Sequence, residues 1–323
     1  MTDYFAKRLL GLIPLFLGIT LISFIVIHLA PGGPVESKVA FNPKMTAQAK
    51  EKMEALYGLD KPLWVQYSHW VRRLVSFDFG NSFVDGEFVT RKIGRAIPVT
   101  LLINALSLGL IFAVGIPLGI WGAVKKGTWI DHSLTVVSLA GFSLPTFWLA
   151  LLAMTFFGVE LRLLPVSGLV SLDYDYFNWW QKIGDVARHL ALPLLVSSVA
   201  GLAGISRFMR SNLLQVLKQD YVRTARAKGL SETQVLYRHA VRNALLPVMT
   251  ILGLSVPGLL GGSVIFESIF SIPGMGRLFY NSVFARDYPV IMGILVLGAG
   301  MTLAGNLLAD AAYALADPRI RWK

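Results

Sequence analysis

The chain has 323 residues, of which 54% are hydrophobic and 15% are charged, and its formal net charge is +11. Soluble domains average about 25% charged residues, so this composition excludes an ordinary soluble protein and favours a membrane protein. The absence of cysteine excludes disulfides, thiolate nucleophiles and cysteine-ligated metal sites. The positive charge is expected from Lys and Arg retained on the cytoplasmic side of a membrane, rather than from nucleic-acid binding.

Apolar stretches long enough to cross a membrane recur along the chain, because about 20 helical residues span roughly 30 Å of hydrocarbon. The first follows Lys7 and Arg8. It exceeds the apolar region of a signal peptide, which has about 7–15 residues, and therefore predicts an uncleaved first helix. The pattern predicts an all-α polytopic protein with six transmembrane helices, at 9–30, 99–124, 133–157, 190–210, 244–266 and 290–313.

Lys and Arg concentrate where six spans would place the chain on one side of the membrane. Lys and Arg lie before the first span, after the second, at several positions of the segment 210–243 and again in the tail 314–323. Cytoplasmic loops carry an excess of these residues. We therefore expect both termini and the segment 210–243 in the cytoplasm.

The segment between the first two spans is expected outside the cell membrane as a small helical elaboration. Thr46 predicts the start of a helix that Gly58 ends, and Lys61-Pro62 begins a second one. An apolar stripe follows at intervals of three and four residues: Trp64, Tyr67, Trp70 and Val71. We expect the stripe to pack on the helical bundle, and the alternative is a position among the lipid headgroups.

Two pairs of glycines indicate close contacts between helices. Gly115 with Gly119, and Gly258 with Gly262, are each four residues apart. Such spacing lets helices approach closely in lipid, where shape fit and interhelical hydrogen bonds replace the hydrophobic drive. These pairs favour a bundle without specifying an oligomer.

No complete motif for ATP hydrolysis or metal-dependent catalysis is present. Gly122 and Gly127 have the spacing of a phosphate-binding loop, but Thr128 stands where that loop requires Lys. The five histidines lack a His-Glu-x-x-His or other close metal spacing. We therefore expect no catalytic residue, no metal site and no cofactor bound by this chain, so that its energy comes from a partner or a gradient.

Polar residues within the spans are few. Asp310 shares a helix face with Asn306 in the last span, and an interhelical hydrogen bond is a plainer role for them than ion coupling. This scarcity disfavours the main alternative, a secondary transporter or channel that works without ATPases. Asn104, Ser107 and Glu267 are candidates for lining a translocation path, although a structural role is the plainer interpretation of each.

The segment 220–243 carries the most informative local signals. Gly229 suits the left-handed end of a helix, and Ser231 with Gln234 forms a capping box that opens a short second helix. The expected hairpin protrudes at the inner membrane face and exposes Val235, Leu236 and Tyr237 beside Arg238 and Arg242. From spacing alone, a docking element for another protein and an amphipathic helix held by anionic lipid fit equally well.

The stretch from Asp220 to Pro247 resembles the Glu-Ala-Ala loop of integral ABC importer subunits, in the form seen in the dipeptide, oligopeptide and nickel permease family. Arg223 and Thr224 replace the first two residues of the general motif, whereas Ala225 and Gly229 fit it. The resemblance extends over nearly the whole chain, through Gly58-Leu-Asp-Lys-Pro-Leu-Trp-Val-Gln-Tyr67, Phe79-Gly-Asn-Ser82, Leu164-Pro-Val-Ser-Gly168, Ile269-Phe-Ser-Ile-Pro-Gly-Met-Gly-Arg277, Arg286-Asp-Tyr-Pro289 and Asp317-Pro-Arg-Ile-Arg321.

The resemblance implies a B-type subunit with the type I ABC importer permease fold. Its parts would be a first helix at 1–30, an extracytoplasmic insertion at 31–95, a permease domain at 96–313 and a cytoplasmic tail at 314–323. Implied partners are a C-type permease subunit, two ATP-binding subunits that hold ATP and Mg²⁺, and an extracytoplasmic solute-binding protein. Peptides, nickel chelates or oligosaccharides would be the solutes.

In that family the short helix of the loop docks into the ATPase subunit. The implied coupling residues are Asp220, Arg223, Thr224, Ala225, Lys228, Gly229, Ser231, Gln234, Val235, Leu236, Arg238 and His239. The resemblance thus favours protein docking over lipid binding for this loop.

Overall fold

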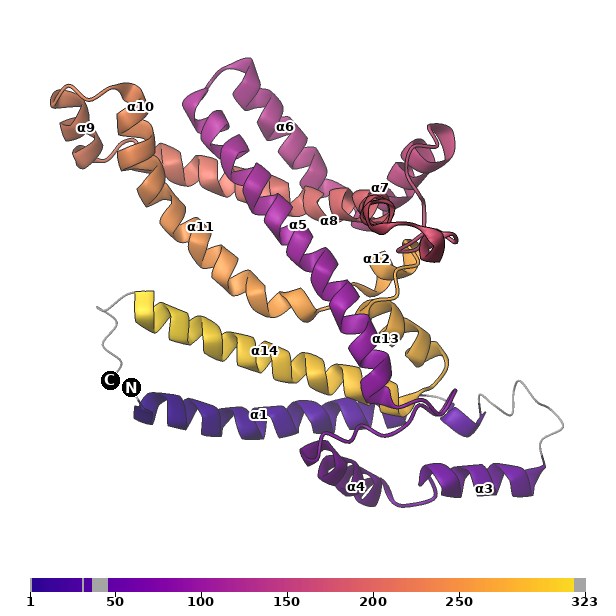
Figure 1. The fold of residues 1–323 in the computed structure, drawn as a ribbon. Coiled ribbons are helices and arrows are strands. Elements are labelled where there is room, and N and C mark those ends of the chain that lie inside the picture. Colours follow the sequence, from indigo (N-terminus) through magenta and orange to yellow (C-terminus); the bar gives the residue numbers. More distant parts are fainter. Residues whose placement is uncertain (1, 31, 37–45, 317–323) are drawn as a thin grey trace. The chain divides into compact units, whose positions relative to one another are not determined.

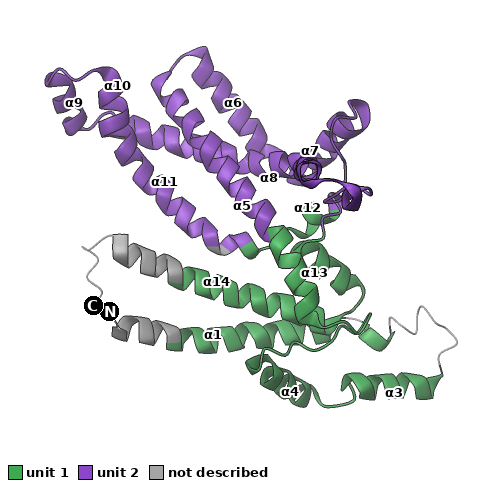
Figure 2. Cartoon of the chain, in the orientation of Figure 1, with its two compact units in different colours: residues 1–100, 260–268, 273–323 green, residues 101–259, 269–272 purple. Residues whose placement is uncertain are grey.

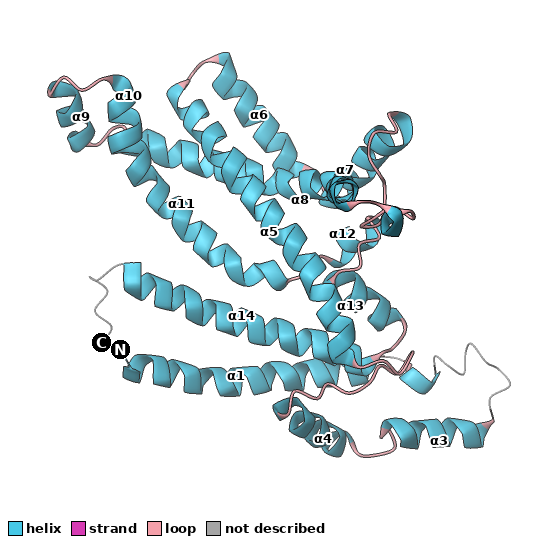
Figure 3. Cartoon of the chain, viewed as in Figure 1, coloured by secondary structure: helices cyan, strands magenta, loops and turns pink. Residues whose placement is uncertain are grey.

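The computed structural model describes residues 2–30, 32–36 and 46–316, with side chains for all of these except 2–9, 257 and 308–316. Figure 3 shows helices joined by loops, and the described residues pair as strands only at an isolated bridge between Asn81 and Phe88. The predicted all-α class is therefore confirmed for this part of the chain. Most of the predicted tail 314–323, and the side chains of Lys7, Arg8 and Asp310, lie outside the described residues.

The chain divides into two compact units (Figure 2). Unit 1 contains residues 1–100, 260–268 and 273–323, and unit 2 contains residues 101–259 and 269–272. The helices of unit 1 are α1 (Thr2–Leu29), α3 (Ala47–Tyr57), α4 (Leu63–Val75), the first turns of α5 (Val89–Val124), most of α12 (Val264–Ile269), α13 (Met275–Phe284) and α14 (Tyr288–Ala316).

Unit 2 contains the rest of α5 and the helices that follow it. These are α6 (Trp129–Ser143), α7 (Thr146–Ala153), the π-helix Met154–Glu160, the 3-10 helix Tyr174–Tyr176, α8 (Trp179–Val216), α9 (Asp220–Ala227), α10 (Glu232–Gln234), the π-helix Val235–Val241, α11 (Arg242–Ser255) and most of the 3-10 helix Val256–Leu260. The long helices α5 and α8 begin earlier than the predicted spans at 99–124 and 190–210, and α8 also ends later.

Four helices of the described chain are long and apolar enough to cross a membrane, and two bent pairs raise that number to as many as six. The third predicted span, 133–157, is broken: α6 and the helix from Thr146 to Glu160 meet at 103°. Leu144 precedes Pro145 and is extended, with ψ at 131°, because the α-helical region is disfavoured for a residue before proline. The fifth span is bent by 46° between Ser255 and Gly258.

The core of unit 1 joins α1 to α14, which run antiparallel (Figure 1) because the end of α1 meets the start of α14. Their contact is made by a cluster of buried side chains: Phe24, Ile27, Tyr288, Ile291 and Met292. Farther along the pair, the ring of Phe16 lies near Gly300. The two helices therefore stay together along much of their length.

The two helices predicted between the first two spans are present as α3 and α4. Thr46 caps α3 by accepting a hydrogen bond from the Ala49 N–H, and Gly58 ends it in the left-handed conformation with φ at 67°. Tyr67 and Trp70 of α4 pack against the α1–α14 core. The prediction was wrong for Trp64, which is 74% exposed because it lies in the first turn of α4, at the edge of the packing face.

Close helix packing in unit 2 confirms the first predicted glycine pair. A Cβ on Gly119 would lie 2.7 Å from the Cβ of Met209 on α8, and one on Gly115 would lie 3.1 Å from Ile205. Met209 and Ile205 belong to the main buried cluster of this unit. The second pair is confirmed in part, because Gly262 lies against the backbone of Gly276 whereas Gly258 faces open space.

Replacing Gly119 with alanine is expected to destabilise the protein by about 1–3 kcal/mol, because the added methyl group overpacks the α5–α8 contact. The matched control is Gly109→Ala in the same helix, where a Cβ would have no atom within 4 Å. Thermal unfolding in detergent measures both. Equal melting temperatures for the two variants would contradict the close packing at Gly119.

Candidate functional site

The segment 220–243 folds as the predicted hairpin. α9 ends at Ala227, and Gly229 follows with φ at 81°, in the left-handed region that favours glycine. Ser231 then opens α10 with a capping box: its hydroxyl accepts from the Gln234 N–H at 3.4 Å, and the Gln234 side chain accepts from the Ser231 N–H at 3.2 Å. The predicted order of helix, glycine and capped helix is therefore confirmed.

A small core gives this hairpin a fixed shape. Val222 and Ala225 share one face of α9 and bury Val235, which is fully inaccessible to solvent. On the outside, the guanidinium of Arg226 donates two hydrogen bonds to the Glu232 carboxylate, at 2.9 and 3.2 Å. Together the apolar contact and the ion pair tie α9 to α10.

The predicted exposure of Val235 was therefore wrong. The short helix α9 has an apolar face that is buried because Val235 packs against it. Leu236 is half-buried against the main core of unit 2, so of the three apolar residues expected at the surface only Tyr237 is exposed, at 59%. Sequence spacing gave no sign of this, because the helix from Val235 to Val241 is a π-helix, whose faces differ from those of an α-helix.

The surface of the hairpin is polar and mostly basic. Arg223 and Asp220 form an ion pair at 3.4 Å with side chains 72% and 94% exposed. Asn243 links the end of the hairpin to its start by donating to the Tyr221 hydroxyl at 2.9 Å. The predicted coupling residues fall into three groups: exposed Asp220, Arg223, Thr224, Lys228, Gly229, Ser231, Gln234 and Arg238; half-buried Leu236 and His239; buried Ala225 and Val235.

The three candidate path residues all take part in hydrogen bonds. Asn104 on α5 donates to the Leu259 carbonyl at 2.7 Å, and Ser107 shares a 2.6 Å hydrogen bond with the Ser197 hydroxyl. Both belong to unit 2, whereas Glu267 belongs to unit 1. Each contact fits the structural interpretation, and a role in a path stays a prediction.

Glu267 is a buried carboxylate whose two oxygens each have a donor. Thr100 donates its hydroxyl proton to Oε1 at 3.0 Å, and the Arg277 N–H donates to Oε2 at 3.0 Å. Glu267 as a whole is 4% exposed in the described chain. The Thr100 hydroxyl also accepts from the Met275 N–H at 2.8 Å, so this residue links α5, α12 and α13 within unit 1.

A buried ion pair that sequence reasoning missed fixes α6 to α8. Arg210 donates from Nε to Asp131 Oδ1 at 2.6 Å and from Nη2 to Oδ2 at 2.8 Å. The Gly127 N–H also donates to this carboxylate, at 3.0 Å. Asp131 is 3% exposed. The sequence shows Asp131 just before one predicted span and Arg210 at the end of another. That pattern is too general to predict an ion pair between two positions so far apart.

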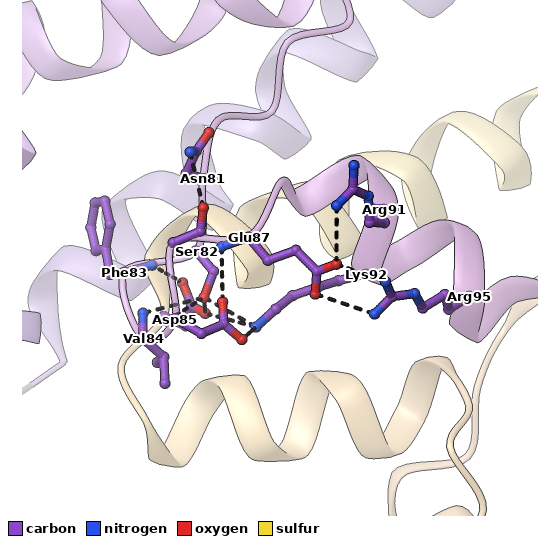
Figure 4. Close-up of polar contacts among 11 residues, drawn as sticks. Asn81, Ser82, Phe83, Val84, Asp85, Glu87, Arg91, Lys92 and Arg95 are labelled. Atoms are coloured by element: carbon purple, nitrogen blue, oxygen red, sulfur yellow. Dashed lines mark hydrogen bonds and ion pairs between the residues drawn. The ribbon is translucent and has the colours of Figure 1, made fainter.

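A second missed cluster joins two motifs that were quoted separately above (Figure 4). Ser82 and the Phe83 N–H both donate to the buried carboxylate of Asp287, at 2.5 and 2.9 Å. Lys92 donates to Ser82 at 3.1 Å and pairs with Asp85 at 2.7 Å. Burial raises the pKa of Asp85, but hydrogen bonds from Lys92 and the Glu87 N–H outweigh it, so the pKa lies below its usual range. This cluster ties the start of α5 to the start of α14.

No group of three or more His, Asp or Glu side chains in the described residues is arranged to hold a metal ion. The geometry of the hairpin offers an exposed and mostly basic surface.

Two family descriptions match the chain. Residues 115–322 match the binding-protein-dependent transport system inner membrane component, and residues 1–105 match the N-terminal part of such membrane components. The segment 220–243 lies within the first match.

Similar proteins match the chain from end to end. It is 43% identical to the oligopeptide transport system permease protein AppB of Bacillus subtilis, covering 100% of both chains. It is 40% identical to the di/tripeptide transport system permease protein DppB of Pseudomonas aeruginosa, over 99% of both, and 38% identical to the dipeptide permease DppB of Escherichia coli, over 100% of both.

A solved structure of an inward-facing MetNI methionine ABC transporter is also similar, with 18% identity and a TM-score of 0.48 over 68% of this chain and 95% of that one.

The family match covers most of the chain, and the relatives match it at full length. These findings confirm the predicted resemblance to permease subunits of peptide ABC importers. The chain belongs to the family of binding-protein-dependent transport system inner membrane components, and is a multi-pass membrane protein.

Proposed function

We propose that the chain is one of two membrane-spanning subunits of an ATP-driven importer of peptides, and forms half of the translocation path. Three relatives that match it at full length are named as oligopeptide, di/tripeptide and dipeptide permeases. Nickel chelates and oligosaccharides are the alternative solutes. Its partners would be a C-type permease, two ATP-binding subunits that hold ATP and Mg²⁺, and an extracytoplasmic solute-binding protein, while this chain binds no cofactor.

In the proposed topology each bent helix pair counts as one span, which gives six transmembrane helices of the type I permease fold. The antiparallel contact of α1 with α14 supports placing the two chain ends on one side. Lys125 and Lys126 and the basic segment 210–243 favour the cytoplasm for that side. The insertion at 31–95 then lies outside, between the first helix at 1–30 and a permease domain at 96–313.

The proposed coupling element is the hairpin at 220–243, which docks into a partner ATPase. The observation that supports this proposal is a basic surface on two helices, α9 and α10, that pack against each other. Arg223 and Lys228 are exposed, while the Val222–Val235 contact and the Arg226–Glu232 ion pair connect α9 to α10. A rigid protrusion can transmit the motion of a partner as a whole, whereas a flexible loop would absorb it.

The mechanism follows from that rigidity. ATP binding would close the two ATPases and displace the hairpin, and α11, which continues directly from its π-helix, would carry the displacement into the membrane. Rocking of the helices around the path would then alternate outward and inward access. Chemistry on ATP takes place in the partners, so this chain is not an enzyme.

Purification from the native membrane under mild conditions tests the assembly. The expected result is recovery of two ATP-binding subunits and a second permease with the wild-type chain, as identified by mass spectrometry. Isolation alone, with solute flux that follows an ion gradient, would instead indicate a secondary transporter.

The docking role has its own test. Arg223→Glu combined with Lys228→Glu is expected to lose most ATPase recovery and uptake, because two repulsive contacts replace two attractive ones. The matched control is Lys125→Glu with Lys126→Glu, which reverses two exposed charges outside the hairpin. Normal uptake by the first double variant would refute the proposed docking site.

Replacing Glu267 with glutamine is expected to lower stability by about 1–3 kcal/mol, because an amide NH₂ would face the Arg277 or Thr100 donor in a buried site. Thr100→Val removes one of the same hydrogen bonds, together with the one that the Thr100 hydroxyl accepts from the Met275 N–H, and leaves the carboxylate in place. If Glu267 also lines the path, only Glu267→Gln should change the KM for uptake in protein that remains folded. Equal KM values for both variants would leave Glu267 a purely structural residue.

A further inference from the structure

The turn between α5 and α6, residues 125–128, carries two positive charges. Lys125 and Lys126 are exposed and have no ion-pair partner among the described residues. The nearest acid in the sequence is Asp131, whose carboxylate already accepts hydrogen bonds from Arg210 and from the Gly127 N–H. Both ammonium groups are therefore left for a partner outside the chain.

A tryptophan lies on each side of this turn. Trp121 precedes Lys125 by one helical turn, shares its helix face and is 48% exposed. Trp129 is the first residue of α6 and is 76% exposed. Tryptophan in membrane proteins prefers the level of the headgroups, where its ring contacts hydrocarbon and its N–H reaches water or polar groups.

The exposed faces of both tryptophans continue as apolar surface along the two helices. Val114 lies seven residues before Trp121, and Val136 lies seven residues after Trp129, so each pair shares a helix face. These valines are 37% and 67% exposed. Along each helix an apolar residue is followed by tryptophan and then by the lysines of the turn, which is the order of hydrocarbon, headgroup and water.

The depth of the turn in the membrane follows from its length. The four residues 125–128 join α5, a candidate span, to α6, the first half of a bent candidate span. The chain therefore leaves the hydrocarbon and enters it again within this turn, which keeps the turn near the headgroup layer. Long Lys side chains at such a position extend toward the headgroups.

We propose that the α5–α6 turn binds the headgroup of an anionic phospholipid. Lys125 and Lys126 donate to its phosphate, while its acyl chains lie against the exposed faces that continue from Trp121 and Trp129. Depth and complementary charge select a lipid over a water-soluble subunit, because such a subunit would meet the lysines but would leave the apolar faces uncovered. The proposal depends on α5 and α6 spanning the membrane and is independent of the transported solute.

A reporter beside the turn measures which lipid lies there. The chain has no cysteine, so Ser133→Cys introduces a single site for a fluorophore in it. Ser133 is exposed one helical turn after Trp129, on the same face. The full chain with its native partners is reconstituted in phosphatidylcholine and phosphatidylglycerol, one of which carries a nitroxide quencher on its acyl chain. Quenching by each labelled lipid gives their relative affinity, and the assembly without Ser133→Cys gives the background from the partners.

In the reporter protein, Lys125→Gln with Lys126→Gln is expected to lower the preference for phosphatidylglycerol roughly 25-fold. The reason is that each basic residue near an anionic surface contributes about a factor of five. The matched control is Lys52→Gln with Lys61→Gln, which removes two exposed lysines without ion-pair partners from the segment between the first two spans. This control should keep the preference of the unmodified reporter.

Three outcomes would overturn the proposal. The first is an equal preference for phosphatidylglycerol in the two double variants. The second is competition by soluble glycerol phosphate, which would show a site for a free phosphate group. The third is loss of a co-purifying protein subunit from Lys125→Gln with Lys126→Gln, which would show that the turn contacts a protein.

Discussion

Replacing Gly229 with valine is expected to reduce both ATPase recovery and solute uptake by roughly 5–30-fold. Gly229 has φ at 81°, and a β-branched residue in that region costs about 1–2 kcal/mol, which lowers the ratio of native to distorted hairpin by this factor. A Cβ at Gly229 would have no atom within 4 Å, so the change acts through the backbone alone. Uptake into proteoliposomes and co-purification of the ATPases measure the two effects.

Gly58→Val is the control for backbone strain without a docking role. Gly58 also follows a helix with a positive φ, 67°, and also faces open space, but it lies between α3 and α4. It should cost similar stability and leave ATPase recovery unchanged. If Gly229→Val kept full uptake, or if Gly58→Val reduced it equally, the shape of the hairpin would have no specific part in coupling.

Local signals in the sequence predicted local structure well. Thr46, Gly58, Gly229 and the Ser231–Gln234 capping box each specify the conformation of a few neighbouring residues, and each forms as expected. The Gly115–Gly119 spacing also predicted a contact, although it did not identify α8 as the other side. Such signals succeed because the residues that define them lie within one or two helical turns.

Features that depend on packing across the chain were not predictable in this way. Whether Val235 is exposed depends on the apolar face of α9, and the periodicity of an α-helix misplaces residues that fall in a π-helix. Hydropathy located the third span but not its break, which follows from the restriction that Pro145 places on Leu144.

The polar contacts of the candidate regions illustrate the same limit. Ser82 and Asp287 are hydrogen-bonded although they belong to motifs that lie 205 residues apart in the sequence. A single sequence shows each motif as a separate signal and gives no measure of their distance in space. The chemistry of a buried carboxylate requires donors nearby, but that requirement does not say which residues supply them.

Removing one member of the Asp131–Arg210 pair is expected to destabilise the protein by about 3 kcal/mol, because a buried charge would lose its partner. This is the lower end for a buried pair, since the Arg210 side chain is 30% exposed. Asp131→Asn and Arg210→Gln each leave the other charge unpaired, whereas the double variant removes both. The double variant should therefore be more stable than the sum of the single effects predicts, and thermal unfolding of the four proteins measures this coupling.

The Arg73–Asp78 pair is the matched control for that cycle. It has the same two-bond geometry, at 2.8 and 3.1 Å, but its side chains are 53% and 52% exposed. Arg73 lowers the pKa of Asp78 by hydrogen bonding, so any stability it adds is present above the ordinary pKa and is lost as the pH falls through the lowered value. At neutral pH its coupling should stay below about 1 kcal/mol, because water screens exposed charges. Equal coupling in the two cycles would mean that burial adds nothing to the Asp131–Arg210 pair.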